Sequence, residues 1–384
     1  MSLIAHRRKI IDILTVAALI VGVAALIAFP KETVDAAKSG LTLCYNVIVP
    51  SLFPFFVLSS LVVETGVARY LGIACERVMR PLFNVGGECA AAFVLGFIGG
   101  YPVGAKTVIA LYESGSCTKP EAERLLSFCN NSGPAFIFGV VGAGVFGSGK
   151  IGLLLYLAHT VASVIVGICF RGWGKSDARA ETRRAVPRRR ATFSAAFTTS
   201  VTSSFTATLG ICGFVIFFTV FIKMLFLSGA LPGLASLLGS ALSPLGFTAQ
   251  WAERLLTGFV ELSSGVWTLR GAAGTLTGSV AMAAFMLGWA GLSVHSQVLS
   301  FIGESGLSVK TYILGKLAQA SLSAALIFLI ARFFPISVPA VFLAQQVTGY
   351  VGITFGQAIA VSGVGSVTVC GLFVLLAWWV DKKG

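Results

Sequence analysis

The chain has few charged residues, and this scarcity decides its environment. Only 11% of its 384 residues are Asp, Glu, Lys or Arg, whereas 56% are hydrophobic, and the mean hydropathy is +0.90. A water-soluble protein of this composition would expose far too much apolar surface. The sequence therefore predicts an integral membrane protein.

Several familiar patterns of enzymes and metal sites are missing. The eight cysteines form no Cys-x-x-Cys pair and no Cys/His cluster, which argues against a disulfide framework or a metal centre. The sequence also lacks a Walker loop, a Gly-x-Ser-x-Gly elbow, a His-Glu-x-x-His motif and a conspicuous intramembrane Asp pair. We expect no enzyme activity, no cofactor and no metal. Without an ATP site, any transport would be secondary or facilitative.

The net charge of +13 lies largely in one polar stretch, residues 171–190. Its basic residues are Arg171, Lys175, Arg179, Arg183, Arg184, Arg188, Arg189 and Arg190. Short basic loops stay on the cytoplasmic side and attract anionic lipid headgroups. We interpret this stretch as a cytoplasmic linker between two membrane halves, with membrane lipids rather than nucleic acid as its partners. A role in recruiting other proteins is the alternative.

Apolar runs of about bilayer-spanning length recur along the chain and predict an all-α polytopic fold. They lie at 10–29, 41–63, 90–112, 125–146, 151–170, 201–228, 280–298, 311–334 and 357–380, with weaker amphipathic pieces at 66–85, 231–247 and 336–350. The first run follows a basic cluster and has no cleavage site, so we expect a retained helix that enters from the cytoplasm. The expected units are an N-terminal transmembrane helix with its connection (1–39), membrane repeat 1 (40–170), the basic linker (171–198) and membrane repeat 2 (199–384).

One glycine-interrupted segment occurs twice. Residues 91–100 and 283–292 match at six of ten positions at a spacing of 192. Such duplication is typical of transporters built from paired repeats, which hold the solute at interrupted helices. If 90–112 turns back as a re-entrant hairpin, repeat 1 has an odd number of spans and repeat 2 is inverted. The basic tail at 381–383 would then face outward, against the positive-inside rule, unless 336–356 also crosses.

The first candidate solute site is a break in the middle of 90–112, because proline and clustered glycines disfavour a helix. Its residues are Gly99, Gly100, Tyr101, Pro102 and Gly104. Lys106 follows within an apolar segment, where a lysine costs about 2.5–3.5 kcal/mol on insertion scales. It would therefore face a cavity and an anionic solute, or alternatively extend to the membrane interface.

The second candidate break combines two amides and a hydroxyl with a Gly-Pro step: Asn130, Asn131, Ser132, Gly133 and Pro134. Interrupted backbone at membrane depth is tolerated only within protein or beside a watery cavity. The helix that restarts after the proline would direct free N–H groups at an anion. An ordinary helix cap at the membrane surface is the alternative reading.

Two polar clusters of the second half complete the candidate site. The first comprises Glu261, Ser263 and Ser264, in which the carboxylate could couple transport to H⁺ or Na⁺ or pair with Arg254, Arg270 or Lys223. The second comprises Ser293, His295, Ser296 and Gln297, which correspond to the break in the first copy. His159 and His295 are lone histidines on apolar helices, a setting more typical of interior residues than of ligands.

Three stretches, GFIGGYPVGAK (96–106), AERLLSFCNNSGP (122–134) and GFVEL (258–262), resemble the YlbJ-type sporulation integral membrane proteins. That family is similar to the nucleoside-recognition, or Gate-domain, membrane proteins, which implies kinship with concentrative nucleoside carriers. The resemblance also implies a bacterial cell or forespore membrane and movement of dipicolinate between mother cell and forespore.

Together these observations predict an alternating-access carrier of a small organic anion, with dipicolinate as the first choice. In dipicolinate, an aromatic dicarboxylate, the carboxylates would suit Lys106 and the Asn130–Ser132 segment, while Tyr101 could stack on the ring. A nucleoside-type solute and a non-transporting scaffold acting through the basic linker are the alternatives. The sequence leaves homo-oligomerisation open.

Overall fold

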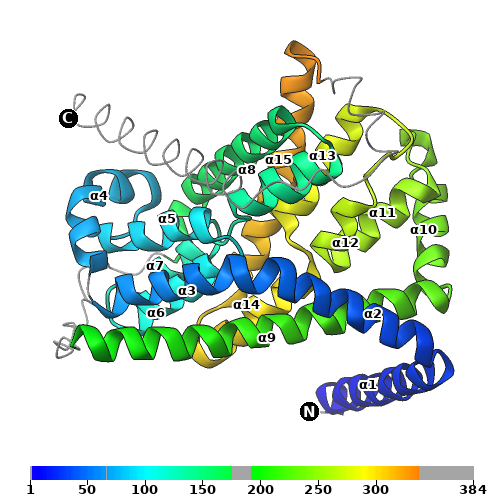
Figure 1. Cartoon of the computed structure of the whole chain (residues 1–384), viewed down its shortest axis with the longest axis horizontal. Helices are drawn as coiled ribbons and strands as arrows, with labels where there is room; N and C mark the ends of the chain where they lie inside the picture. The colour runs from blue at the N-terminus through cyan, green and yellow to red at the C-terminus, as the bar shows by residue number, and fades with distance from the viewer. Residues whose placement is uncertain (1, 66, 175–191, 337–384) are drawn as a thin grey trace.

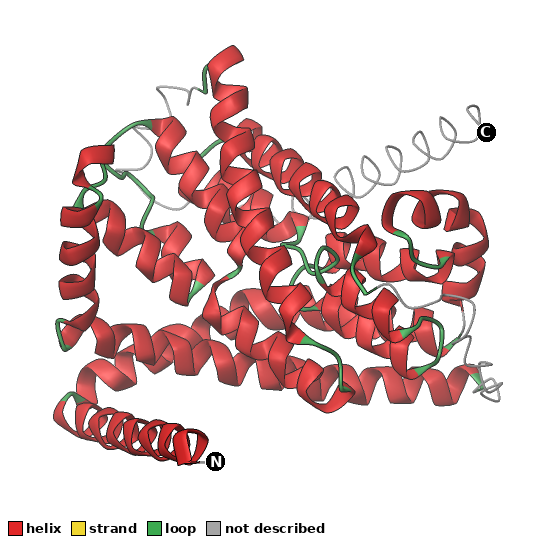
Figure 2. Cartoon of the chain, turned by 180° about the vertical axis from the view of Figure 1, so that it is seen from behind, coloured by secondary structure: helices red, strands yellow, loops and turns green. Residues whose placement is uncertain are grey.

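All regular elements in the described part of the chain are helices, as predicted (Figure 2). The computed structural model describes residues 2–65, 67–174 and 192–336. In chain order, the elements are α1 (Ser2–Ala28), α2 (Pro30–Leu43), η1 (Cys44–Ile48), α3 (Val49–Glu64), α4 (Val67–Phe83), η2 (Gly87–Cys89), α5 (Ala90–Gly99), α6 (Val103–Glu113), α7 (Lys119–Leu126), η3 (Ala135–Val145), α8 (Gly149–Cys169), η4 (Phe170–Gly172), α9 (Phe193–Leu227), α10 (Ala230–Ala241), η5 (Ser243–Leu245), α11 (Ala249–Val260), α12 (Leu262–Trp267), α13 (Leu276–Trp289), α14 (Gly291–Ser305) and α15 (Val309–Phe333).

Four helical stretches of the described chain are long and apolar enough to cross a membrane, and bent helix pairs raise the number to as many as six. The four are Gly149–Gly172, Phe193–Leu227, Leu276–Ser305 and Val309–Phe333. They coincide with the predicted runs at 151–170, 201–228, 280–298 and 311–334. The predicted N-terminal span at 10–29 lies in α1, and the chain bends by 98° between α1 and α2, just after this span. The predicted helix at 357–380 and most of the piece at 336–350 lie outside the described residues.

The predicted break in 90–112 makes α5 and α6 a helical hairpin. A Cβ built on Gly96 would lie 3.2 Å from Cα of Gly104, so the two arms are in close contact. Gly100 at the tip has φ +78°, a left-handed conformation that suits glycine. A second hairpin is formed by α11 and α12, in which a Cβ on Gly265 would lie 2.1 Å from Cα of Gly258. Small residues thus allow both hairpins to close.

Each hairpin is followed by an interrupted helix and then by a long one. After α5/α6 come α7 and η3, separated by residues 127–134, and then α8; after α11/α12 come α13 and α14, interrupted at Ala290, and then α15. By this order, the matching segments 91–100 and 283–292 lie in unlike elements. The first forms a hairpin arm, and the second belongs to the 30-residue stretch Leu276–Ser305. Two inverted repeats remain a prediction.

The core surrounds the point where α8, α13 and α15 pack together. Gly288 of α13 allows this contact, because a Cβ there would lie 2.4 Å from Cα of Ala320 on α15. Figure 1 shows α9 running beside α2 and α3 along one edge of the molecule. Since α9 begins at Phe193, its first turns occupy the end of the predicted linker, whose centre (175–191) lies outside the described residues. The domain boundaries remain predictions.

Candidate functional site

The two predicted breaks of the first half lie against each other. A Cβ on Gly100 would lie 2.8 Å from the backbone nitrogen of Gly133, and one on Gly104 would lie 1.9 Å from the carbonyl oxygen of Cys129. The side-chain oxygen of Asn130 accepts a hydrogen bond from the backbone N–H of Ala105 at 3.4 Å. The hairpin tip and the segment Asn130–Pro134 therefore form one unit, and the glycines are the reason that the backbones can approach so closely.

A lysine of the second half holds this unit together. The ammonium of Lys316 on α15 donates to the hydroxyl of Tyr101 at 2.9 Å, to the carbonyl oxygen of Asn130 at 2.9 Å and to Oε1 of Gln319 at 2.8 Å. Its side chain is 0% exposed. The Tyr101 hydroxyl in turn donates to the carbonyl oxygen of Leu287 at 2.6 Å. An ammonium has three donors, so all three are used by uncharged acceptors.

The amide of Gln319 extends the network to the second asparagine and to a histidine. Its nitrogen donates to Oδ1 of Asn131 at 2.7 Å and lies 3.2 Å from Nε2 of His159. The same ring nitrogen accepts from the backbone N–H of Ser132 at 3.2 Å. Because Nε2 serves as the acceptor, the neutral ring carries its proton on Nδ1. His159 thus fixes the broken backbone, consistent with its expected interior role.

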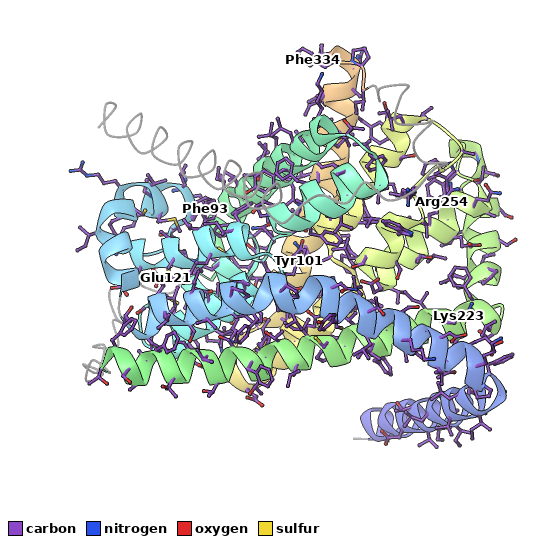
Figure 3. The ribbon with its side chains drawn as sticks, in the orientation of Figure 1. Phe93, Tyr101, Glu121, Lys223, Arg254 and Phe334 are labelled. Atoms are coloured by element: carbon purple, nitrogen blue, oxygen red, sulfur yellow. The ribbon has the colours of Figure 1, made fainter. Side chains whose placement is uncertain are left out.

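The network is enclosed in the described conformation. Asn131 is 0% exposed and Asn130 is 1% exposed, and the side chain of Tyr101 lies near the middle of the molecule (Figure 3). The breaks are neither helix caps at the molecular surface nor walls of the two hollows described below. Tyr101 uses its hydroxyl within the network. Direct solute binding by Gly99, Gly100, Tyr101, Pro102, Asn130, Asn131, Ser132 and Gly133 therefore remains a prediction for another conformation.

A cavity of about 430 Å³ lies outside this hydrogen-bond network, between α6, α9 and α14. Its polar lining residues are Lys106, Ser203, Thr206, Gln297 and Ser300, and its apolar ones are Ala207, Gly210, Ile211, Phe214 and Phe301. The ammonium of Lys106 is buried and has no hydrogen-bond partner among the described residues. It lies 4.8 Å from the centre of the Phe56 ring. The structure thus brings two predicted residues, Lys106 and Gln297, to one cavity.

A second hollow of about 390 Å³ adjoins the first along α9. The two share Gly210 and Phe214, and Ser296 of α14 lines the second together with Gly213, Phe217 and Phe218. Ser296, another predicted residue, therefore lies beside an aromatic surface. Figure 1 shows α14 close to the long helix α9, where the hollows are found.

Glu261 occupies the tip of the second hairpin, where it caps α12. Its Oε1 accepts from the backbone N–H of Ser263 at 2.9 Å, and its Oε2 accepts from that of Ser264 at 2.6 Å. The carboxylate is 3% exposed. In the described chain these two backbone bonds take the place of the expected ion pair with Arg254, Arg270 or Lys223. Capping explains how a carboxylate is stabilised in the protein interior.

His295 lies in an aromatic cluster rather than in a cavity. Its Nδ1 is 2.8 Å from the hydroxyl of Tyr312, and its ring centre is 4.3 Å from that of Trp289. Ser293 is also buried near the start of α14. Neither residue lines the two hollows described above. Within the described part of the chain, no group of three or more His, Cys, Asp or Glu side chains could hold a metal ion.

Lys316 and Gln319 were missed by the sequence analysis, although a signal for them exists. A lysine inside the apolar run 311–334 is as costly as Lys106, and Gln319 stands three residues later, on the same helical face. Ser203 and Thr206 were also missed. They lie in an apolar run rich in serine and threonine, and only packing reveals which of these hydroxyls reach the cavity.

Comparison with known proteins identifies the family of the chain. The Gate family model, described as nucleoside recognition, matches residues 46–172. The chain is 32% identical over 298 residues to the sporulation integral membrane protein YlbJ of Bacillus subtilis (strain 168), covering 73% of each chain. It is 31% identical over 136 residues to an uncharacterized protein of Alkalihalophilus pseudofirmus, covering 34% of this chain and 29% of that one. No solved structure matches it. The chain therefore belongs to the YlbJ family of sporulation integral membrane proteins.

Proposed function

We propose that the protein is a secondary or facilitative carrier of a small organic anion, with dipicolinate as its first candidate substrate. The observation that carries this proposal is the Lys106 ammonium, which is buried, lacks a hydrogen-bond partner among the described residues and borders a cavity of about 430 Å³. Ligand sites of small molecules occupy about 300–1,000 Å³. A carboxylate would give Lys106 a charge-assisted hydrogen bond. The hydroxyls of Ser203 and Thr206 donate to carbonyl oxygens of their own helix in the described conformation and would turn to donate to its other oxygen.

The arrangement of the helices supports transport by alternating access. The cavity lies between α6, an arm of the first hairpin, and α9, which packs beside α2 and α3. Movement of the hairpin unit against α9 would expose the cavity to one side of the membrane and then to the other. Such a carrier needs no cofactor. If the carrier is secondary, coupling to H⁺ or Na⁺ would drive entry of the anion into a compartment of negative potential, which opposes its entry.

The test is uptake of labelled dipicolinate by proteoliposomes that contain the full chain. We expect Lys106→Met to raise the half-saturating concentration by about 10- to 150-fold, the equivalent of one hydrogen bond to a charged group. Lys150→Met is the matched control, since Lys150 is exposed at the start of α8 and lines neither hollow. Unchanged uptake by Lys106→Met would exclude this cavity as the solute site.

A nucleoside-type solute is the second candidate, favoured by the match of the nucleoside-recognition model to residues 46–172. Gln297, Ser203 and Thr206 could hydrogen-bond the sugar and base of such a solute. Competition by uridine and adenosine against dipicolinate uptake separates the two candidates. If neither solute is taken up and deletion of 175–190 abolishes function in spore-forming cells, the chain acts as a scaffold through its basic linker.

A further inference from the structure

The second hollow along α9 has no role in the function proposed above. It is lined mainly by the rings of Phe214, Phe217 and Phe218 and by the glycines Gly210 and Gly213. Phe214 and Gly210 belong to both hollows, so the aromatic surface continues directly from the cavity that contains Lys106. The combined site has a cationic, hydroxyl-rich end and an aromatic end.

We propose that the two hollows form one binding site that recognises one carboxylate and the flat aromatic ring that carries it. The carboxylate binds Lys106, and the ring lies against Phe214 and the neighbouring glycines. This inference rests on the proposed function and deepens it, because it assigns recognition of the ring to α9 rather than to Tyr101, whose hydroxyl is engaged by Lys316. A second carboxylate on the solute is therefore dispensable for binding.

The charges around the site support recognition of one carboxylate. Among the described residues that line the two hollows, Lys106 is the one with a charged side chain. Lys316, the next candidate cation, already donates to three acceptors inside the enclosed network. A second carboxylate would meet only neutral groups, such as the amide of Gln297, which bind it less strongly than an ammonium does. The hydroxyl of Ser300 already donates to the carbonyl oxygen of Gln297 at 2.7 Å.

The shape of the aromatic end favours a ring over an aliphatic body. Phe217 and Phe218 meet edge to face, with their ring centres 5.4 Å apart. Gly210 and Gly213 are exposed and contribute no side chain, and a Cβ on either would meet nothing within 4 Å, so this face of α9 is open beside Phe214. Aromatic pairs in offset or edge-to-face geometry contribute affinity beyond that of the area they bury. A puckered saturated ring of similar size gains only the affinity that comes from the area it buries.

The experiment is competition against uptake of labelled dipicolinate by the full chain in proteoliposomes, with benzoate and cyclohexanecarboxylate as matched competitors. Both carry one carboxylate on a six-membered ring, and only benzoate is flat and aromatic. We expect benzoate to inhibit at about 2- to 12-fold lower concentration, which is the worth of one aromatic pair. Phe214→Leu should remove this preference. Phe197→Leu, at an exposed position of the same helix that lines neither hollow, should keep it.

The outcomes separate this inference from the function on which it rests. Equal inhibition by the two competitors would overturn the inference, and so would a preference for benzoate that survives Phe214→Leu. If dipicolinate is still taken up in these experiments, the carrier function is unaffected. Failure of benzoate to compete at all would show that the second carboxylate is required and would also overturn it. Absence of dipicolinate uptake by the parent protein overturns both proposals.

Discussion

The ammonium of Lys316 donates a hydrogen bond of 2.9 Å to the hydroxyl of Tyr101, a residue 215 positions earlier in the chain. The bond joins the unbroken helix α15 to the tip of the first hairpin. Buried backbone groups that no helix satisfies need other partners. Lys316 meets this need at the carbonyl oxygen of Asn130, and Gln319 donates to the side-chain oxygen of Asn131. The second half of the chain thus supplies the side chains that stabilise the break in the first.

Lys316→Met should lower the free energy of unfolding by about 1–3 kcal/mol. The substitution leaves the carbonyl oxygen of Asn130 and Oε1 of Gln319 without their buried donor. Removal of a buried charge offsets part of this cost, because its desolvation penalty disappears too. Thermal unfolding of the purified protein in detergent, followed by tryptophan fluorescence, measures the change.

Lys310→Met is the control for Lys316→Met, since Lys310 is exposed on the same helix. We expect it to unfold at the temperature of the parent protein. A Lys316→Met variant that is as stable as the parent would mean that the network contributes no net stability.

Gly100→Ala should destabilise the first hairpin. The added methyl would lie 2.8 Å from the backbone nitrogen of Gly133, and the position has φ +78°. Strain of this kind costs about 1–3 kcal/mol. Gly139→Ala is the matched control, because a Cβ there meets nothing within 4 Å. The yield of monodisperse protein from membranes and its unfolding temperature test the prediction, and equal behaviour of both variants would contradict it.

Thr206→Cys, introduced into a chain whose native cysteines are replaced by serine or alanine, should react with a charged thiol reagent. Thr206 and the adjacent Phe205 are both exposed, but only Thr206 lines the cavity beside Lys106. Because the thiolate forms readily only in water, a cysteine in a hydrated cavity reacts faster than one facing lipid. Labelling rates of Thr206→Cys and Phe205→Cys, with and without dipicolinate, give the comparison. Equal rates would indicate that the cavity is dry.

Glu261→Gln should reduce stability by about 0.5–2 kcal/mol and leave the ion dependence of uptake unchanged. The carboxylate accepts two backbone hydrogen bonds at the start of α12, and an amide can accept with only one of its two terminal atoms. Unfolding temperature and uptake at several pH values and Na⁺ concentrations are the measurements. If the variant loses pH or Na⁺ dependence yet remains fully stable, Glu261 is a coupling group and not a cap.

The breaks could be predicted from sequence because their causes are local. Gly100 and Pro102 disfavour a helix in any context, and the helix is interrupted between α5 and α6 as expected. The repeat of 91–100 at 283–292 was less informative about tertiary structure. The same glycine-rich pattern supports a hairpin arm in α5 and half of an interrupted helix in α13, because neighbouring elements decide how the chain continues.

The candidate site was predicted in part. Lys106 was singled out by the cost of a lysine in an apolar segment, and it borders the cavity. The same reasoning applies to Lys316 but does not reveal that its three donors are used internally. Glu261 was expected either to couple transport to an ion or to pair with a cation, and in the structure its carboxylate accepts two backbone hydrogen bonds. Such outcomes depend on which groups lie within about 3 Å in the folded chain.

The sequence by itself determined the membrane environment, the helical class and the positions of the breaks, since composition and the backbone preferences of glycine and proline act over a few residues. The tertiary structure alone decided that Lys316 satisfies Tyr101 and Asn130, and that Lys106 meets Ser203, Thr206 and Gln297 around a cavity. These groups come from helices far apart in the chain. The contacts between these groups depend on how the helices pack against one another, which the apolar periodicity of a single helix does not specify.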